Sequence, residues 1–348
     1  MKIPFCKPSW DEREVEAVSE VIRSGWWTDG PKVKEFETKF AEYVGAKHAV
    51  FLNSCTSALF LSLKWEQKKK GFIANTVYVP SLTFCATVNE IVNAGMIPVF
   101  GDVDRDTLCL EPNGEEYGMA LPVHLIGNQA FTDYPYPVVE DSAHRIIKGQ
   151  CFGSKNSVCF SFYATKNIST GGEGGMICTN DDDAYIWFQQ ARHHGISKGG
   201  WDRYKEGGSW RYDIEFVGWK ANSPDMQGAI GLVQLDKLDS FNANRFRVID
   251  TYNSEFGYFH KGLHLYPILV GDRDEFITFM KKNGIQCSVH FLPIHKMSAY
   301  KFDVDLPNTD YLGEHLVSLP LFPSMTNQEV EYVCQKVKES NQLLPWLG

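Results

Sequence analysis

The sequence predicts an α/β protein with a large mixed sheet, and two observations lead to this fold class. Between residues 48 and 103, short apolar runs alternate with segments of helical periodicity, an order typical of parallel strand–helix–strand crossovers. From about residue 257 the pattern changes to a shorter series of strands and helices. The 348 residues, 43% of them hydrophobic and 22% charged, are enough for two domains with a sizeable core. We therefore predict a large domain over 1–240 and a small α+β domain over 257–348.

The first elements can be assigned from apolar spacing and turn residues. Residues 10–24 carry valines and an isoleucine on one helical face, and residues 33–45 predict a second helix that ends at Gly45. A strand follows at 49–52 and leads into a helix that begins near Ser54. The chain is thus expected to enter its first strand after two helices.

The later elements follow from the same rules. In the first part of the chain we expect strands at 77–79, 97–103, 119–125, 137–140, 158–163 and 176–178, and helices at 83–93, 181–195 and 223–256, the last of which links the two domains. In the second part we expect a strand at 264–270, a helix at 274–284, a strand at 286–293 and a final helix at 327–344. The connections near 113–118 and 128–135 are too short for crossover helices, so the sheet is trimmed or has antiparallel neighbours.

Composition and charge exclude several classes of protein. The net charge of -9 gives no electrostatic reason to expect nucleic-acid binding. No apolar run approaches the roughly 20 residues that span a bilayer, and the first residues contain no signal-peptide core. The nine cysteines are scattered without a C-x-x-C pair, which indicates reduced thiols and neither a disulfide framework nor a zinc site. We expect a cytoplasmic protein without a metal.

Three polar features stand at the ends of predicted strands. Short hydroxyl and thiol side chains at 54–57 begin a helix, where they either cap it or, with the free N–H groups, form an anion site. Asp141 ends a strand, and it either caps the next turn or faces the crevice where α/β proteins bind ligands. Lys166 lies between an apolar strand and a glycine cluster at 171–175, and it is either a solvated loop lysine or a nucleophile.

Together these features match the requirements of pyridoxal phosphate. That cofactor needs an anion site, an acid partner for its pyridine nitrogen and an amine that forms a Schiff base. Asp141 would keep the nitrogen protonated, and the freed amine of Lys166 could move a proton between Cα and C4′. A Rossmann oxidoreductase is disfavoured because no G-x-G-x-x-G follows the first strand. GGEGG is not a P-loop, because no Gly-Lys-Ser/Thr follows it.

Longer motifs connect the chain with a known family. Nearly the whole sequence contributes, and the most specific stretches are NSCTSAL, VVEDSAH and SFYATKN followed by GEGG. In these stretches the chain resembles the DegT/DnrJ/EryC1/StrS family of nucleotide-sugar aminotransferases. The resemblance implies the aspartate-aminotransferase fold, fold type I, and pyridoxal 5'-phosphate as the cofactor, which alternates with its pyridoxamine form.

The resemblance also implies roles for individual residues. Lys166 would form the Schiff base, and Asp141 would hold the pyridine nitrogen. The other cofactor contacts would be Phe84 stacked on the ring, His144 beside it, and Cys55, Thr56 and Ser161 at the phosphate. The stretch 218–222 matches a family loop that crosses to the other subunit, so Lys220 and Asn222 would act in trans and a homodimer is implied.

The implied reaction transfers an amino group, with glutamate as the usual donor, to a nucleotide-linked keto sugar. A 4-keto-6-deoxyhexose is expected first and a 3-keto sugar second. The long glycine- and aromatic-rich loop at 196–213 and two later histidines would face this substrate. The residues concerned are Trp201, Arg203, Tyr204, Tyr212, His290 and His295. The alternative for these side chains is a packing role.

The sequence departs from the family pattern in three features, and two alternative functions remain. Cys55 occupies a position where the family usually has glycine, and Tyr163 and Ala164 stand where His-Pro is common. The short connections imply that two peripheral helices of the family are absent. One alternative is a non-catalytic regulator or partner subunit. The other is a sugar dehydratase, although that branch of the family has histidine at the position of Lys166.

Overall fold

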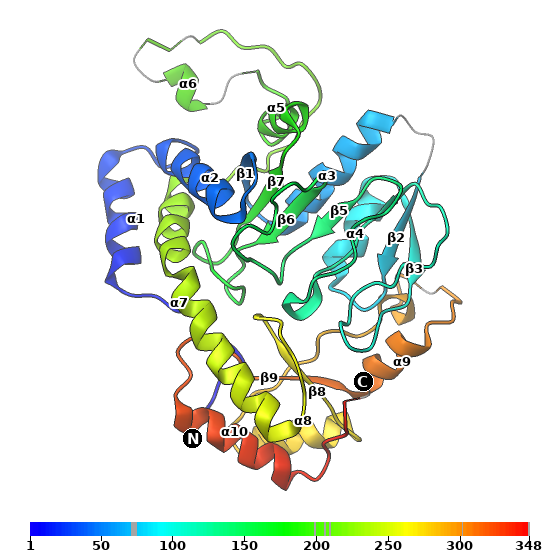
Figure 1. Ribbon diagram of the computed structural model, residues 1–348. Coiled ribbons are helices and arrows are strands. Elements are labelled where there is room, and N and C mark those ends of the chain that lie inside the picture. Colours follow the sequence, from blue (N-terminus) through cyan, green and yellow to red (C-terminus); the bar gives the residue numbers. More distant parts are fainter. Residues whose placement is uncertain (71–74, 198–199, 205–206, 209, 301, 347–348) are drawn as a thin grey trace. The chain divides into compact units, whose positions relative to one another are not determined.

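The computed structural model describes residues 1–70, 75–197, 200–204, 207–208, 210–300 and 302–346. The chain forms two compact units, each built from segments that are distant in the sequence (Figure 1). Unit 1 comprises Met1–Ser9, Ala74–Val138 and Asp239–Gly348, and unit 2 comprises Trp10–Ile73 and Val139–Leu238. The domain limits expected from the sequence, 1–240 and 257–348, remain a prediction.

Unit 2 contains a mixed four-stranded sheet with the strand order β1-β7-β6-β5. Its strands are β1 (His48–Leu52), β5 (Val139–Asp141), β6 (Ser157–Ser161) and β7 (Gly175–Thr179). β5 runs parallel to β6, with Asp141 opposite Cys159. β7 runs antiparallel to both of its neighbours, and Gly175 lies opposite Ser161. The predicted α/β fold with a mixed sheet is confirmed.

Helices cover both faces of this sheet. The ring of Phe40 lies 5.0 Å from that of Phe160, whereas the Ser62 hydroxyl lies 3.3 Å from the Cys159 thiol. Because neighbouring residues of a strand point to opposite faces, the helices that carry Phe40 and Ser62 cover opposite faces of β6. The helices of unit 2 are α1 (Glu12–Ser24), α2 (Pro31–Val44), α3 (Cys55–Lys70), α5 (Asp182–Ala191), α6 (Gly200–Tyr204) and the first part of α7 (Asp225–Phe256).

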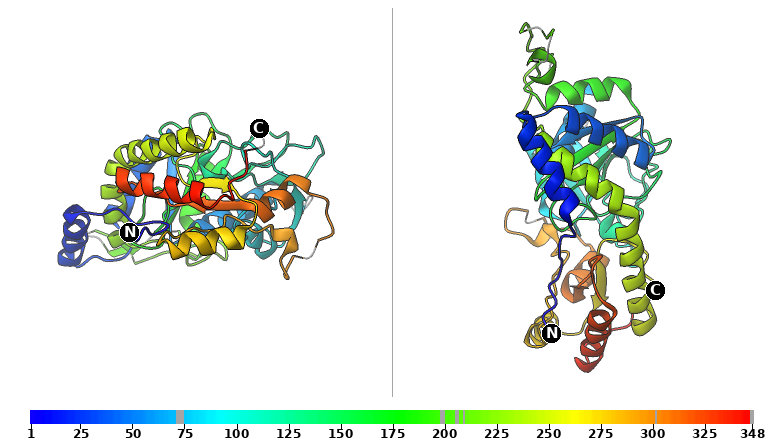
Figure 2. Two further views of the ribbon diagram at one scale, coloured as in Figure 1. Left: turned by 90° about the horizontal axis from the view of Figure 1, so that it is seen from below. Right: turned by 90° about the vertical axis from the view of Figure 1, so that its left-hand side faces the viewer.

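The helices α1, α6 and α7 can be compared with the sequence. α1 begins with a capping box formed by Asp11 and Glu14, and it ends at Gly25, whose φ of 74° favours glycine. α7 is one helix of 32 residues, seen from two further directions in Figure 2. α6 is a short helix inside the predicted loop at 196–213. Parts of that loop lie outside the described residues, namely 198–199, 205–206 and 209.

Side chains close the outer edge of β1. Phe51 donates its backbone N–H to Glu37 Oε1 (2.8 Å), and its carbonyl accepts a hydrogen bond from Arg192 Nη1 (2.7 Å). The same guanidinium nitrogen bonds Glu37 Oε1, and both side chains are at most 9% exposed. Just beyond the strand, Asn53 donates its N–H to the carbonyl of Ala221 (2.8 Å). These bonds satisfy backbone groups that an open strand edge would leave unpaired.

Unit 1 contains a parallel three-stranded sheet of order β3-β2-β4 and an antiparallel pair, β8 and β9. The strands are β2 (Thr76–Pro80), β3 (Ile97–Gly101), β4 (Met119–Ala120), β8 (Tyr266–Leu269) and β9 (Leu316–Leu319). The helices are α4 (Cys85–Asn93), α8 (Arg273–Lys282), α9 (Pro307–His315) and α10 (Asn327–Glu339), with 3-10 turns at Leu125–Gly127 (η1) and Ile294–Lys296 (η2). Tyr252, Tyr266 and Phe276 are fully buried in the core that these later elements share with the end of α7.

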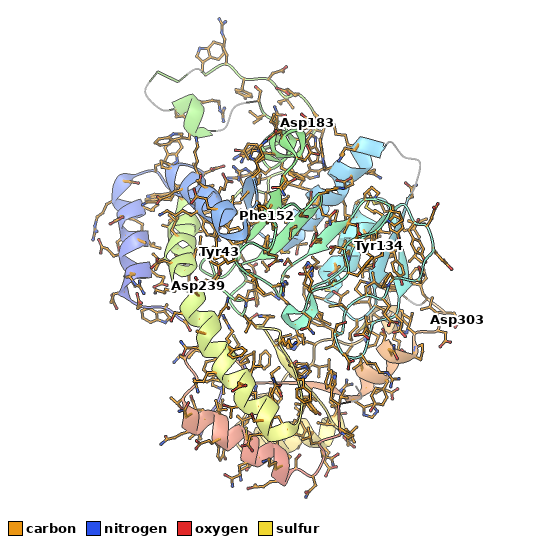
Figure 3. The ribbon with its side chains drawn as sticks, in the orientation of Figure 1. Tyr43, Tyr134, Phe152, Asp183, Asp239 and Asp303 are labelled. Carbon is orange, nitrogen blue, oxygen red and sulfur yellow. The ribbon has the colours of Figure 1, made fainter. Side chains whose placement is uncertain are left out.

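The two connections between β3 and β5 contain no α-helix, as the sequence predicts. Tyrosines of these connections instead stack on one another and on Tyr78 of β2. The rings of Tyr78 and Tyr117 are parallel, 4.7 Å apart, and Tyr134, labelled in Figure 3, stacks on Tyr136 at 5.4 Å. The Tyr78 hydroxyl also donates a hydrogen bond to the carbonyl of Glu111 (2.6 Å). Aromatic side chains therefore supply apolar cover where crossover helices are absent.

Several sequence-based assignments need correction, among them the final helix, which ends at Glu339 and not at 344. The strand expected at 286–293 is absent, and the segment makes only a bridge between Ser288 and Ser318. The strand expected at 119–125 ends at Ala120, because Pro122 has no N–H to donate to a neighbouring strand. α9 and β9 lie in a stretch for which the sequence predicts no element.

Within the described ranges, no helix is both long enough and apolar enough to cross a membrane. The described residues also contain no group of three or more His, Cys, Asp or Glu side chains that could hold a metal ion.

Candidate active site

The first turn of α3 follows directly from β1. The Ser54 hydroxyl accepts a hydrogen bond from the N–H of Ser57 (3.1 Å), so Ser54 caps the helix. The N–H groups of Cys55 and Thr56 precede the first intrahelical bonds, and in this position such groups can bind an anion. Cys55 is buried and Thr56 is exposed. The two interpretations of this stretch, a cap and an anion site, are therefore compatible.

Gly175 allows this turn to approach the sheet closely. A Cβ atom at Gly175 would lie 2.3 Å from the carbonyl carbon of Ser54 and 2.4 Å from the nitrogen of Cys55. Gly175 is also the register partner of Ser161, which is buried at the end of β6. Glycine is required here because any side chain would push the turn of α3 away from the strand. The turn and Ser161 are thereby brought to the same end of the sheet.

Asp141 is the last residue of β5, and Lys166 follows the end of β6. Asp141 is buried, and its Oδ1 accepts a hydrogen bond from the N–H of Ala143 (3.0 Å). Lys166 is half-buried in a turn, in which its N–H bonds the carbonyl of Tyr163 (2.9 Å). A bridge between Tyr163 and Gly172 closes the loop. The backbone on either side of the lysine is therefore held in place.

The charges of Asp141 and Lys166 both act on the Cys55 thiol. Burial raises the pKa of the Cys55 thiol well above its ordinary value, the charge of Asp141 raises it further, and the charge of Lys166 lowers it. Charges act strongly on a neighbouring group only over short distances. The thiol therefore stays neutral at physiological pH. Three of the predicted cofactor residues therefore interact electrostatically at the first turn of α3.

The segment 220–222 runs beside the end of β1. Asn222 forms a bridge with Leu52, and its buried Oδ1 has no hydrogen-bond partner in the part of the chain that the structure describes. Lys220 is exposed and lies near Asp29. Burial raises the pKa of Asp29, and neighbouring cations, Lys220 among them, lower it below its ordinary value. Both predicted residues are thus carried by a segment that bonds to the strand leading into α3. Their action in trans remains a prediction.

Several other predicted residues belong to separate parts of the chain. His144 is buried in unit 2. Phe84 precedes α4 in unit 1, is 56% exposed, and its ring lies 5.8 Å from that of Phe291. His290, also in unit 1, is half-buried and has its Nδ1 2.9 Å from the Ser318 hydroxyl. Their roles in cofactor and substrate binding remain predictions.

His295 is buried in unit 1, and both of its ring nitrogens have partners. Nδ1 lies 2.7 Å from Ser81 Oγ, and Nε2 lies 3.2 Å from Asp310 Oδ1. Its backbone N–H donates to the same serine oxygen (3.0 Å). This contact ties the loop before α4 to the segment at η2. The packing alternative for His295 is therefore well supported, and its substrate role remains a prediction.

The described aromatic side chains of the 196–213 loop are exposed. Trp201 meets the ring of Trp26 edge-on at 4.9 Å. The guanidinium of Arg203 lies 4.7 Å from the centre of the Tyr212 ring and 5.4 Å from that of Tyr204. Such cation–π contacts stabilise a loop and can equally present a flat surface to a ligand. The role of these side chains in substrate binding stays a prediction.

The arrangement in unit 2 fits pyridoxal phosphate. The turn of α3 offers N–H donors for a phosphate, Asp141 offers a buried carboxylate and Lys166 offers an amine. Sequence reasoning missed buried polar contacts of unit 2 such as that between Glu14 and Gln234, which are 220 positions apart in the sequence and bond each other. The sequence carries no signal for them, because polar residues on an amphipathic helix are usually exposed.

Comparison with known proteins places the chain in a family. The model of the DegT/DnrJ/EryC1/StrS aminotransferase family matches residues 8–338. The spore coat polysaccharide biosynthesis protein SpsC of Bacillus subtilis is 37% identical over 380 residues, which cover 97% of this chain and 96% of SpsC. Because the alignment is longer than the 348 residues of this chain, SpsC has segments that this chain lacks.

Solved structures give the same answer for the fold. The PMP-form of "Putative sugar aminotransferase Spr1654" from Streptococcus pneumoniae has a TM-score of 0.85 at 29% identity, over 97% of this chain and 99% of that chain. Helicobacter pylori PseC, an aminotransferase involved in the biosynthesis of pseudoaminic acid, has a TM-score of 0.86 at 23% identity, over 98% and 99% of the two chains. These similarities confirm the predicted fold type I. With its family model matched along nearly all of its length, the chain belongs to the DegT/DnrJ/EryC1/StrS aminotransferase family.

Proposed function

We propose that this chain is a pyridoxal-phosphate-dependent aminotransferase that moves an amino group from glutamate to a keto sugar linked to a nucleotide. A 4-keto-6-deoxyhexose is the first candidate for the sugar. The observation that supports the proposal is that the charges of Lys166 and Asp141 both act on the Cys55 thiol in the first turn of α3. Family membership supports the aminotransferase chemistry, and the description of Spr1654 as a sugar aminotransferase supports the substrate class.

The residues of unit 2 have distinct tasks in holding the cofactor. Pyridoxal phosphate, when bound, supplies an aldehyde that reacts with amines and a ring that takes up the electrons of a broken C–H bond. The N–H groups of Cys55 and Thr56, together with Ser161, would bind the phosphate. Asp141 would hold a proton on the ring nitrogen, and His144 would lie beside the ring. The neutral thiol of Cys55 adds no negative charge next to the phosphate.

Lys166 would do the proton transfer. Its amine is the group available at this site for the covalent bond that holds the cofactor. With glutamate bound, Lys166 Nζ would be the base that takes the proton from the glutamate Cα. The same nitrogen would return a proton when the amino group passes to the sugar. The backbone bonds of the lysine turn hold the segment that carries this amine in place.

We also propose a homodimer in which Lys220 and Asn222 of each subunit complete the site of the other. Two features support this arrangement: the stretch 218–222 resembles the family loop that crosses between subunits, and Asn222 is only partly buried beside the end of β1. Mixing inactive Lys166→Ala and Asn222→Ala proteins tests it. If Asn222 acts in trans, mixed dimers contain one intact site and activity returns. If mixing restores nothing while mixed dimers form, the arrangement is wrong.

The function itself is tested with purified protein supplied with pyridoxal phosphate. We expect visible absorbance, fixation of the cofactor to the peptide that contains Lys166 on treatment with borohydride, and release of 2-oxoglutarate from glutamate when a suitable nucleotide keto sugar is present. Lys166→Ala should show none of these, whereas the exposed loop lysine variant Lys155→Ala should behave as the wild type. A wild-type protein that releases no keto acid with any amino donor and nucleotide sugar would contradict the proposal. A protein that stays colourless would point to a non-catalytic role.

A further inference from the structure

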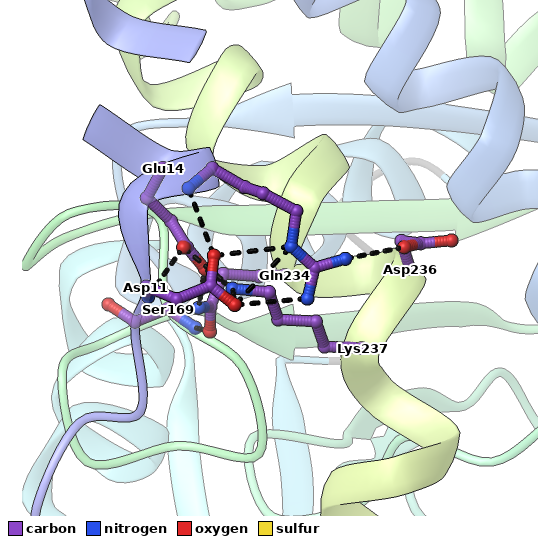
Figure 4. A network of polar contacts seen from close by, with 7 residues as sticks. Asp11, Glu14, Ser169, Gln234, Asp236 and Lys237 are labelled. Carbon is purple, nitrogen blue, oxygen red and sulfur yellow. Dashed lines mark hydrogen bonds and ion pairs between the residues drawn. The ribbon is translucent and has the colours of Figure 1, made fainter. Parts of the chain in front are cut away.

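A buried polar cluster joins α1, α7 and the loop that carries Lys166 (Figure 4). Its buried members are Glu14, Gln234 and Lys237, which are 5 to 7% exposed. At its outer side Lys237 Nζ also lies 2.8 Å from Asp11. Buried charges are tolerated only when they are paired and hydrogen-bonded, so the partners in this cluster constrain one another.

Glu14 is the centre of the cluster. Lys237 Nζ lies 2.7 Å from each of its carboxylate oxygens, and Gln234 Nε2 donates to Oε1 at 2.5 Å. Asp11 donates its backbone N–H to Oε2 (3.0 Å). Burial raises the pKa of Glu14, and the hydrogen bonds from Lys237, Asp11 and Gln234 lower it by more, so that it lies below its ordinary value. The carboxylate is therefore ionised and can only accept hydrogen bonds.

Gln234 connects this cluster to the lysine loop. Because Glu14 can only accept, the amide of Gln234 must turn its NH2 group towards Glu14. Its Oε1 then faces Ser169 and accepts a hydrogen bond from the backbone N–H of that residue (3.3 Å). Ser169 stands three residues after Lys166, and its own hydroxyl accepts the N–H of Gly172 (3.3 Å). Only a side chain with a donor and an acceptor at its end satisfies both neighbours.

The same face of α7 supports the rest of the loop. Gln227 Nε2 donates to the carbonyl of Glu173 (2.9 Å). A Cβ atom at Gly171 would lie 2.8 Å from Ile230 Cδ1, so the loop backbone packs directly on this isoleucine. Gln227, Ile230 and Gln234 are spaced as i, i+3 and i+7 and therefore share one face of the helix. The loop after the lysine thus lies along α7.

We propose that Gln234 is a positioning residue for Lys166, because it holds the loop that follows the lysine while the Glu14–Lys237 pair fixes the orientation of its amide. This inference rests on the proposed function, in which Lys166 transfers the proton. A shift of the loop at Ser169 moves the lysine turn, and small displacements of a reacting group cost large factors in rate. α1 then influences the reaction although it touches no substrate.

Hydrogen exchange in the cofactor-free protein tests the contact directly. In Gln234→Leu the acceptor is lost, and the Ser169 amide should exchange roughly three- to tenfold faster, the factor that corresponds to one net hydrogen bond. The matched control is Asp236→Asn on the same helix, whose carboxylate is exposed and pairs with Arg13 at the surface. That variant should leave Ser169 exchange unchanged. Equal exchange rates in Gln234→Leu and wild type would overturn the proposal.

Exchanging the side chains of Glu14 and Gln234 tests the orientation of the amide. This test can be used even if Gln234→Leu does not fold. Gln234→Glu alone places two carboxylates against each other, and their repulsion should loosen the loop and speed exchange at Ser169. The double variant Glu14→Gln/Gln234→Glu restores one amide and one carboxylate at the contact. Its Ser169 exchange should return towards the wild-type rate. A double variant that exchanges as fast as the single variant would contradict the proposed role.

The holoenzyme shows whether the contact matters for the reaction. Gln234→Leu should lower kcat for keto-acid release by about tenfold or more, while KM for glutamate stays within about twofold, as expected for a residue that orients a reacting group. The pH dependence of the visible absorbance of the bound cofactor should also shift. An active wild type with an unchanged kcat and absorbance in the variant would overturn the positioning role alone. A wild type without any keto-acid release would instead overturn the proposed function.

Discussion

The buried ion pair at the edge of β1 leads to a quantitative prediction of stability. Arg192→Met removes the partner of Glu37 and the donor to the carbonyl of Phe51, while much of the side-chain volume is kept. A buried charge that loses its partner costs about 3–5 kcal/mol. A buried carbonyl that loses its donor costs about 1–3 kcal/mol. We expect the free energy of unfolding to fall by about 4 kcal/mol or more at pH 8.

The loss of stability in Arg192→Met should depend on pH, and the pKa of Glu37 determines the direction of this dependence. Burial raises the pKa of Glu37 above the ordinary value of 4.5, and Arg192 opposes this rise. Removing Arg192 therefore raises the pKa further. A carboxyl group whose pKa is higher in the folded than in the unfolded protein stabilises the folded state fully while the pH is below 4.5. This stabilisation is lost as the pH rises through the pKa of the folded state. The free energy of unfolding of Arg192→Met should consequently be closer to that of the wild type at pH 5 than at pH 8.

Urea unfolding followed by tryptophan fluorescence at these two pH values measures both effects. Arg23→Met is the control, because Arg23 is exposed and pairs with Glu16 at the surface, and its midpoint should not change. The double variant Glu37→Gln/Arg192→Met removes the buried charge and should recover part of the loss. The reasoning would be refuted if Arg192→Met lost the same stability at pH 5 and pH 8, or if its unfolding midpoint equalled that of the Arg23→Met control.

Three further predictions concern the site. Gly175→Ala pushes the new methyl group against the peptide between Ser54 and Cys55, which should weaken cofactor affinity about tenfold or more in a spectroscopic titration. Cys55 should resist alkylation at pH 8 until urea is added, because its pKa is raised, whereas the exposed Cys85 should react at once in peptide mass spectra. Asp141→Asn can keep the bond from the Ala143 N–H but loses the charge, and keto-acid release should fall by roughly 10²- to 10³-fold.

The fold around the lysine could be predicted because its signals are local. β6 and β7 fall within two residues of the apolar runs at 158–163 and 176–178, since glycines and polar residues bound those runs. The strand expected at 286–293 depends instead on a partner. Its pairing with β9 stops after the two hydrogen bonds between Ser288 and Ser318, which no pattern within the segment reveals.

For the site, the sequence reveals the reacting groups but not their supports. Lys166 and Asp141 are conspicuous because each follows an apolar strand. The contact between Glu14 and Gln234 joins residues 220 positions apart. In sequence both are ordinary polar residues of helices, where exposure is the common outcome. Their burial depends on how α1 and α7 pack, and helical periodicity alone does not define that packing.

During synthesis, β1 leaves the ribosome long before β7, its neighbour in the sheet. Until β7 has been made, the nascent chain presents an apolar strand with open backbone groups on both sides. Glu37 is already present at that stage, but Arg192, the second half of the cap on Phe51, is not. Exposed strands of this kind attract chaperones and other unfinished chains. The yield of folded protein in a cell should therefore fall when the ribosome takes longer to reach Arg192.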